Sequence, residues 1–248
     1  MKNLEQVQYW KPLSYFGLTN SFFDIDPEIV VHTWILIAMM CVLLFLVQRE
    51  LPKQHSIGRF ITISGVKGFA QLCTETLGIF SFQHFCFVAS IFTFILACNT
   101  LALFPFLIEP TKDLNTTFAL GLIAFFYTQT YAIKEHGIIG YIKEYFTPFV
   151  VMMPLHVVSK LSSVMSLSFR LFGNILAGAT IMHVWFGAID GSIILETVGI
   201  ISGLNLVIAL FFGIFEGVLQ AFIFSMLTLT YLSIALQGED HESDEVMP

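Results

Sequence analysis

Long apolar stretches dominate this chain, and they decide which solvent it can fold in. The first covers Ile29–Val47, two more cover Phe85–Leu107 and Thr117–Ile133, and two longer ones fill the C-terminal part. A helix needs about 20 apolar residues to cross a bilayer. Hydrophobic residues make up 56% of the chain and charged residues only 12%, a balance that a soluble domain does not sustain. We therefore expect an all-α, polytopic membrane protein.

The last two apolar stretches are too long for one perpendicular span each. They run from Met152 to Gly187 and from Ile193 to Leu236. At about 1.5 Å per residue, a helix over either stretch would be far longer than the bilayer is thick. Each is therefore either two short spans or one long, tilted helix. Because the strongest break is the segment 187–192, we favour a hairpin of two long tilted helices.

The segment 54–82 mixes charged and apolar side chains. Arg59 and Lys67 alternate there with isoleucine, valine and phenylalanine residues. Such a pattern is typical of a helix lying along the membrane surface. The N-terminal part is thus expected to hold about three spans and one surface helix.

Basic residues give the expected orientation. They follow the first span and also the third, where Lys134 and Lys143 stand. The positive-inside rule places both loops in the cytoplasm, so the loop Glu109–Asn115 faces the outer side. The expected divisions are an outer-face segment over 1–28, a membrane domain over 29–236 and a solvated acidic tail over 237–248.

Arg170 places a charge inside one of the long apolar stretches. A guanidinium keeps its charge, because its pKa lies above about 12. Burying it at bilayer depth costs roughly 2.5–3.5 kcal/mol on insertion scales. A chain that keeps such a residue generally uses the charge on ions or protons. Asn174 lies one turn later on the same helix face and can bind or orient the guanidinium.

Glu216 and Gln220 are one turn apart and share a face of the second long stretch. A carboxyl group in apolar surroundings can be neutral or charged near physiological pH, which suits a proton relay. The alternative is a static counter-ion that neutralises Arg170.

His183 follows Arg170 by thirteen residues, about 220° around a helix, so it points away from the arginine. It is either a packing histidine or part of a proton path with Glu216. His156 and Lys160 are expected at the membrane edge.

Small residues gather on both long stretches. Ser159, Ser162, Ser163 and Ser166 fall largely on one face, and Gly213–Gly217 forms a G-x-x-x-G pattern. Small residues let helices approach closely in lipid. Ordinary helix packing explains each of them singly, but together they indicate a smooth face for a partner.

Other chemistry is missing from the sequence. The four cysteines are scattered without metal spacing, and no nucleotide-binding, hydrolase or zinc motif occurs. We expect no metal, no cofactor, no nucleic-acid partner and no catalytic chemistry by this chain itself.

The segment Ser166–Gly178, which reads SLSFRLFGNILAG, resembles the signature of subunit a of F-type ATP synthases. Leu219–Leu232 resembles the final helix of that family, and Asn99–Thr117 resembles its second span and following loop. The match covers roughly residues 85–237 in order.

The resemblance implies a stator subunit beside a rotating ring of proteolipid subunits c, together with the peripheral-stalk subunit b and other ATP synthase subunits. Protons would enter by an outer half-channel, ride the ring and leave by an inner one. Arg170 would face the ring, lower the pKa of an arriving carboxyl and block leaks. Asp113 is a candidate in the outer-face loop. The implied location is a bacterial plasma membrane, with an organelle inner membrane less favoured.

This chain departs from the family pattern at two path positions. Ala179 and Gly213 stand where many members have polar groups, and His183 and Glu216 each lie about one turn away. The rival interpretation is a secondary transporter that uses Arg170 to bind an anion. That fold would predict internal repeats and broken helices, and the sequence contains no sign of either.

Overall fold

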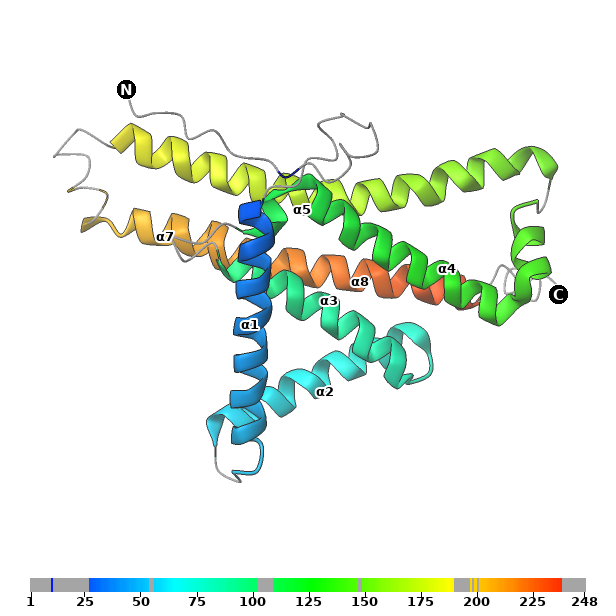
Figure 1. Ribbon diagram of the computed structural model, residues 1–248, viewed down its shortest axis with the longest axis horizontal. Coiled ribbons are helices and arrows are strands. Elements are labelled where there is room, and N and C mark those ends of the chain that lie inside the picture. The colour runs from blue at the N-terminus through cyan, green and yellow to red at the C-terminus, as the bar shows by residue number, and fades with distance from the viewer. Residues whose placement is uncertain are drawn as a thin grey trace, which may run out of the picture.

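The computed structural model describes residues 10, 27–53, 56–101, 109–146, 149–189, 197, 199 and 201–237. Most of the expected outer-face segment and of the acidic tail, and part of the break at 187–192, lie outside these residues. Helices form the architecture of the described chain, so the predicted all-α fold is confirmed (Figure 1). They are α1 (Pro27–Glu50), α2 (Ile57–Leu77), α3 (Phe82–Thr100), α4 (Leu114–Glu144), α5 (Met153–Ile189), α7 (Leu204–Leu210) and α8 (Glu216–Gln237).

Shorter turns join or extend these helices. A 3-10 turn over Pro110–Lys112 precedes α4, and another over Val150–Met152 precedes α5. A π-helical segment, Phe211–Phe215, connects α7 to α8 without a break in the helical path. The second long helix therefore runs from Leu204 to Gln237.

Four helices are long and apolar enough to cross a membrane: α1, α3, α5 and the part of α8 up to Leu236. The predicted span Thr117–Ile133 lies within α4, which does not meet that criterion. The polar run Tyr127–Tyr131 lowers its mean hydropathy. Two of its side chains turn inward, since Thr128 is buried and Tyr127 stacks on Phe87 of α3. The helix itself is present, but its apolar character is weaker than expected.

Glycines in left-handed conformations set three of the helix boundaries and bends. Gly78 ends α2 with φ 76°, and Gly137 bends α4 with φ 70° and ψ 164°. Gly203, with φ 67°, directly precedes α7. Glycine adopts this region without steric cost. The expected continuous helix from Ile193 is thus wrong at its start, because Gly203 interrupts it.

The two long helices form the predicted hairpin. In Figure 1, α5 and the α7–α8 helix run along the long axis of the molecule, while α1 stands across that axis. A helix of the length of α5 fits a bilayer only when it is strongly inclined. The arrangement agrees with two long tilted helices.

The main core lies where α3, α4, α5 and α8 meet. Its buried side chains are Ile91, Ile95, Ala124, Leu167, Leu171, Ala221 and Phe224. A second cluster joins α2, α3 and α8 through Cys73, Val88 and Leu229. These contacts hold α5 and α8 in fixed register, which positions the polar residues described next.

Candidate functional site: two cavities flanking Arg170

Arg170 lies on the open face of α5. Its side chain is exposed, and within the described ranges it makes no hydrogen bond or ion pair, while the next residue, Leu171, is fully buried in the core. One side of α5 therefore packs on α4 and α8, and the opposite side presents the guanidinium outward. Ser159, Ser162 and Ser166 are also exposed, so small side chains lead along α5 towards Arg170.

Asn174 binds Gln220 rather than Arg170. Its Nδ2 donates a hydrogen bond of 2.7 Å to Gln220 Oε1, which joins α5 to α8. Gln220 is 2% exposed, and a buried amide needs such a partner. The prediction that Asn174 orients the guanidinium is therefore wrong for this structure, because the side-chain amide of Asn174 binds Gln220 of α8 instead.

Glu216 and Gln220 line one cavity of about 200 Å³, which we call the Glu216 cavity. Glu216 Oε2 and Gln220 Nε2 are buried and form no hydrogen bond with the part of the chain that the structure describes. A polar cavity of this size has room for water molecules that could bind both atoms. The polar residues of its lining are Asn99, Glu109, Lys112, Asn174, Glu216 and Gln220.

Close backbone contacts shape this cavity. A Cβ on Gly178 of α5 would lie 3.6 Å from Glu216 Oε2, so the carboxyl points at α5. Gly217 packs on α3, where a Cβ would lie 2.8 Å from Asn99 Cβ, and Asn99 Nδ2 donates to the Gly217 carbonyl at 3.0 Å. Gly217 therefore serves internal packing, not the external partner that the G-x-x-x-G pattern suggested.

The static counter-ion interpretation of Glu216 finds no support. No ion pair joins Glu216 to Arg170 in the described structure. Arg170 is exposed on one side of α5, whereas Glu216 faces Gly178 across the α5–α8 contact.

His183 and Asp113 lie outside the cavity lining. His183 is exposed on α5, while its neighbour Met182 lines the Glu216 cavity. The structure therefore does not bring His183 together with Glu216. Asp113 precedes α4 and accepts hydrogen bonds from Asn115 and Thr116, at 3.5 and 3.4 Å. Its carboxyl serves the start of that helix.

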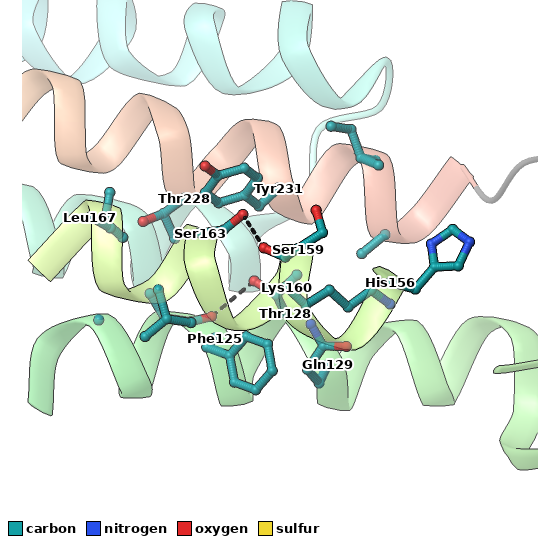
Figure 2. A pocket seen from close by; sticks show the side chains of 15 residues that line it. Phe125, Thr128, Gln129, His156, Ser159, Lys160, Ser163, Leu167, Thr228 and Tyr231 are labelled. Carbon is teal, nitrogen blue, oxygen red and sulfur yellow. Dashed lines mark hydrogen bonds between the residues drawn. The ribbon is translucent and has the colours of Figure 1, made fainter. Parts of the chain in front are cut away.

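A second cavity of about 300 Å³ lies between α4, α5 and α8, and we call it the Lys160 cavity. Figure 2 shows its side chains gathered around one space, with Thr128 and Gln129 from α4 and Thr228 and Tyr231 from α8. Its residues from α5 include His156, Ser159, Lys160 and Ser163. No carboxylate occurs in this lining as far as the described residues define it.

Aromatic rings hold the Lys160 ammonium. It lies 4.2 Å from the centre of the Tyr145 ring and 5.0 Å from that of Tyr141. Tyr141 in turn donates a 2.6 Å hydrogen bond to Gln129 Oε1. A cation over aromatic faces is stabilised electrostatically, so Lys160 keeps a fixed place beside the cavity.

The two cavities meet α5 on opposite sides of Arg170. The Lys160 cavity contacts α5 from His156 to Leu167, and the Glu216 cavity contacts it from Asn174 to Met182. The gap from Leu167 to Asn174 corresponds to about 10 Å along a helix. Beside this stretch of α5, the space between the helices is occupied by the main core, in which Leu171 and Phe224 are fully buried. A layer of buried, mainly apolar side chains therefore separates two polar spaces, and Arg170 lies at its level.

A model of the family described as the ATP synthase A chain matches residues 30–233. The chain belongs to the family of ATP synthase subunit a. It is 32% identical over 219 residues to ATP synthase subunit a 3 of Pelobacter propionicus, covering 86% of this chain and 90% of that protein. ATP synthase subunit a of Moorella thermoacetica is 31% identical, with coverage of 84% and 90%. That of Desulforamulus reducens is 38% identical over 157 residues, covering 63% and 57%.

Family membership confirms the resemblance drawn from the Ser166–Gly178 signature. The chain is a multi-pass membrane protein with the role of subunit a in an F-type ATP synthase, and it works with other subunits of that complex. The alternative of an anion transporter is therefore not favoured.

In this subunit a, Glu109 is one cavity residue that the sequence did not single out. It is 9% exposed and lines the Glu216 cavity, whereas the outer-face loop residue named from the sequence was Asp113. One signal was available, because Glu109 directly follows an apolar run and precedes Pro110. His156 and Lys160 were expected at the membrane edge, but their shared cavity depends on three helices that are far apart in sequence.

Proposed function

We propose that this subunit conducts protons through two half-channels and couples their flow to the rotation of a ring of subunits c. The Glu216 cavity would be the outer half-channel, because it includes residues of the loop Glu109–Asn115. The Lys160 cavity would be the inner one, because it lies towards the α4 end that carries Lys134 and Lys143. The observation that carries the proposal is the separation of the cavities by a buried, mainly apolar layer at the level of Arg170.

Each residue has a defined part in this mechanism. Glu216 would bind a proton from the outer side, and Gln220 with Asn174 would orient water near the ring. A carboxyl of the ring would take the proton, turn through the lipid, and then meet Arg170. The guanidinium would lower the pKa of that carboxyl, so its proton would leave through the Lys160 cavity.

The same arrangement explains why protons would not bypass the ring. Water and polar groups carry protons, whereas packed apolar side chains such as Leu171 and Phe224 do not. The positive charge of Arg170 repels a proton on the exposed face of α5 at that level. We further propose that the exposed face with Ser159, Ser162 and Ser166 packs against the ring, and that subunit b is another partner. A bacterial plasma membrane is the proposed location.

Cysteine accessibility tests the two half-channels. The four native cysteines are first replaced, and then Ala179→Cys, Ser163→Cys and Leu171→Cys are made separately. A charged, membrane-impermeant thiol reagent should label Ala179→Cys from the outer side and Ser163→Cys from the cytoplasmic side. Leu171→Cys should react from neither side, because Leu171 is fully buried. Labelling of both cavity positions from the same side would contradict the proposal.

A further inference from the structure

We propose that Glu109 is a second proton-binding carboxyl of the Glu216 cavity, an inference that rests on the proposed outer half-channel. It takes a proton from water at the cavity mouth and passes it towards Glu216. When this proton has left, Glu109 is a carboxylate, which can bind the next proton.

The loop that carries Glu109 is fastened beside Glu216. The backbone N–H of Lys112 donates to the Glu109 carbonyl at 3.0 Å, which closes the 3-10 turn. Thr111 is fully buried, and its Oγ1 donates to Asn99 Oδ1 at 3.5 Å. Asn99 in turn binds the carbonyl of Gly217, the residue after Glu216. This chain of contacts fixes the Glu109 carboxyl at the cavity wall.

Exposure places Glu109 behind Lys112 in the wall of the cavity. The Lys112 side chain is 42% exposed and that of Glu109 11%, with 4.0 Å between Lys112 Nζ and Glu109 Oε1. Lys112 therefore lies at the mouth of the cavity and Glu109 behind it. Glu109 and Glu216 are the two carboxyl groups of the lining among the residues described. The amides of Asn99 and Gln220 cannot store a proton, so the carboxyls must do so.

The charges around Glu109 suit a proton relay. Burial raises the pKa of the Glu109 carboxyl above its ordinary value, and the Lys112 ammonium opposes that rise. Among the residues that the structure describes, Cys98 of α3 lies close enough to interact electrostatically with Glu109, and Glu216 of α8 lines the same cavity. The described residues of α5 add no titratable side chain to this lining. Two opposed influences, burial and the Lys112 charge, therefore act on the proton affinity of Glu109.

The first experiment measures passive proton conduction in membrane vesicles that contain the assembled membrane sector but not the catalytic head. Glu109→Gln should slow conduction about tenfold or more. This expectation is conservative, because removing a positioned proton-transfer group generally has a larger effect. Glu75→Gln is the matched control, because Glu75 is an exposed residue of α2, outside both cavities, and should leave the rate unchanged. Slow conduction in Asp113→Asn with normal conduction in Glu109→Gln would overturn the inference.

The second experiment separates a proton-binding role from a structural one. Conduction from the outer side should fall as the outer pH rises through the pKa of Glu109, because the group then remains unprotonated. Lys112→Gln removes the charge that lowers this pKa, so the fall should move to higher pH. In Glu109→Gln, this fall in conduction with rising outer pH should be absent. An unshifted profile in Lys112→Gln would contradict the inference even if Glu109→Gln failed to assemble.

These outcomes are distinct from failure of the proposed function. If Glu109→Gln conducts like the wild type while Arg170→Ala still loses coupled pumping, only the assignment of Glu109 is wrong. If Arg170→Ala keeps coupled pumping, the proposed function itself is wrong.

Discussion

At the residue scale, Glu216 stands at the junction of a π turn and a regular helix. The π segment Phe211–Phe215 ends directly before it, and Gly178 opposite leaves room for its carboxyl. π turns are frequent at functional sites, because the extra residue changes the direction of the following side chains. The spacing of Glu216 and Gln220 predicted a shared face, and both do line one cavity. The π turn itself was not predictable, since apolar residues surround it on every side.

Replacing Glu216 by Gln should slow passive proton conduction about tenfold or more, because an amide of similar shape cannot carry the proton. The pH profile of conduction should change with it, and Glu216→Asp should restore part of the rate. Vesicles with the assembled membrane sector provide the measurement. A wild-type rate and pH profile in Glu216→Gln would reduce Glu216 to a packing residue.

Asn174 and Glu109 mark the limit of prediction for single residues. The sequence placed Asn174 one turn from Arg170, but the hydrogen bond goes to Gln220, whose position depends on how α8 packs. Glu109 reaches the cavity because Thr111 and Asn99 fasten its loop to α3 and α8. Helical spacing predicts neighbours within one helix, and neither contact lies within one helix.

At the scale of elements, apolar length alone predicted the two long helices. α5 extends over Met153–Ile189, close to the expected Met152–Gly187, because nothing in that stretch interrupts a helix. The other long helix begins later than expected, after Gly203, since a lone glycine in an apolar stretch does not reveal a positive φ. The extent of the two long helices was predictable from composition, whereas the break at Gly203 depends on backbone conformation.

The contact between α3 and α8 beside the Glu216 cavity is close, and Gly217 permits it. Gly217→Ala should destabilise the subunit by about 1–3 kcal/mol, because the added Cβ would lie 2.8 Å from Asn99 Cβ and push the helices apart. Thermal unfolding of the purified membrane sector in detergent measures the effect.

Gly68→Ala in α2 is the control for that substitution. A Cβ at Gly68 meets nothing within 4 Å, so stability should be unchanged or slightly higher. Equal stability of Gly217→Ala and the wild type would mean that the α3–α8 contact relaxes freely.

At the scale of the whole molecule, two polar cavities lie along α5 with a mainly apolar core between them. The Lys160 cavity draws on α4, α5 and α8, while the Glu216 cavity draws on α3, α5, α8 and the loop before α4. Both therefore depend on how segments far apart in sequence pack together. Arg170 was recognisable from the sequence as an unusual charge, but its location between two cavities required the fold.

The most direct test of this account is ATP-driven proton pumping by the whole complex with Arg170→Ala, measured in inverted membrane vesicles. The account predicts that pumping is abolished while the complex assembles and ATP hydrolysis continues, because ring carboxyls would no longer meet a fixed positive charge. Arg59→Ala, which removes an arginine of α2 that lines neither cavity, should pump like the wild type. Coupled pumping retained in Arg170→Ala would contradict the account.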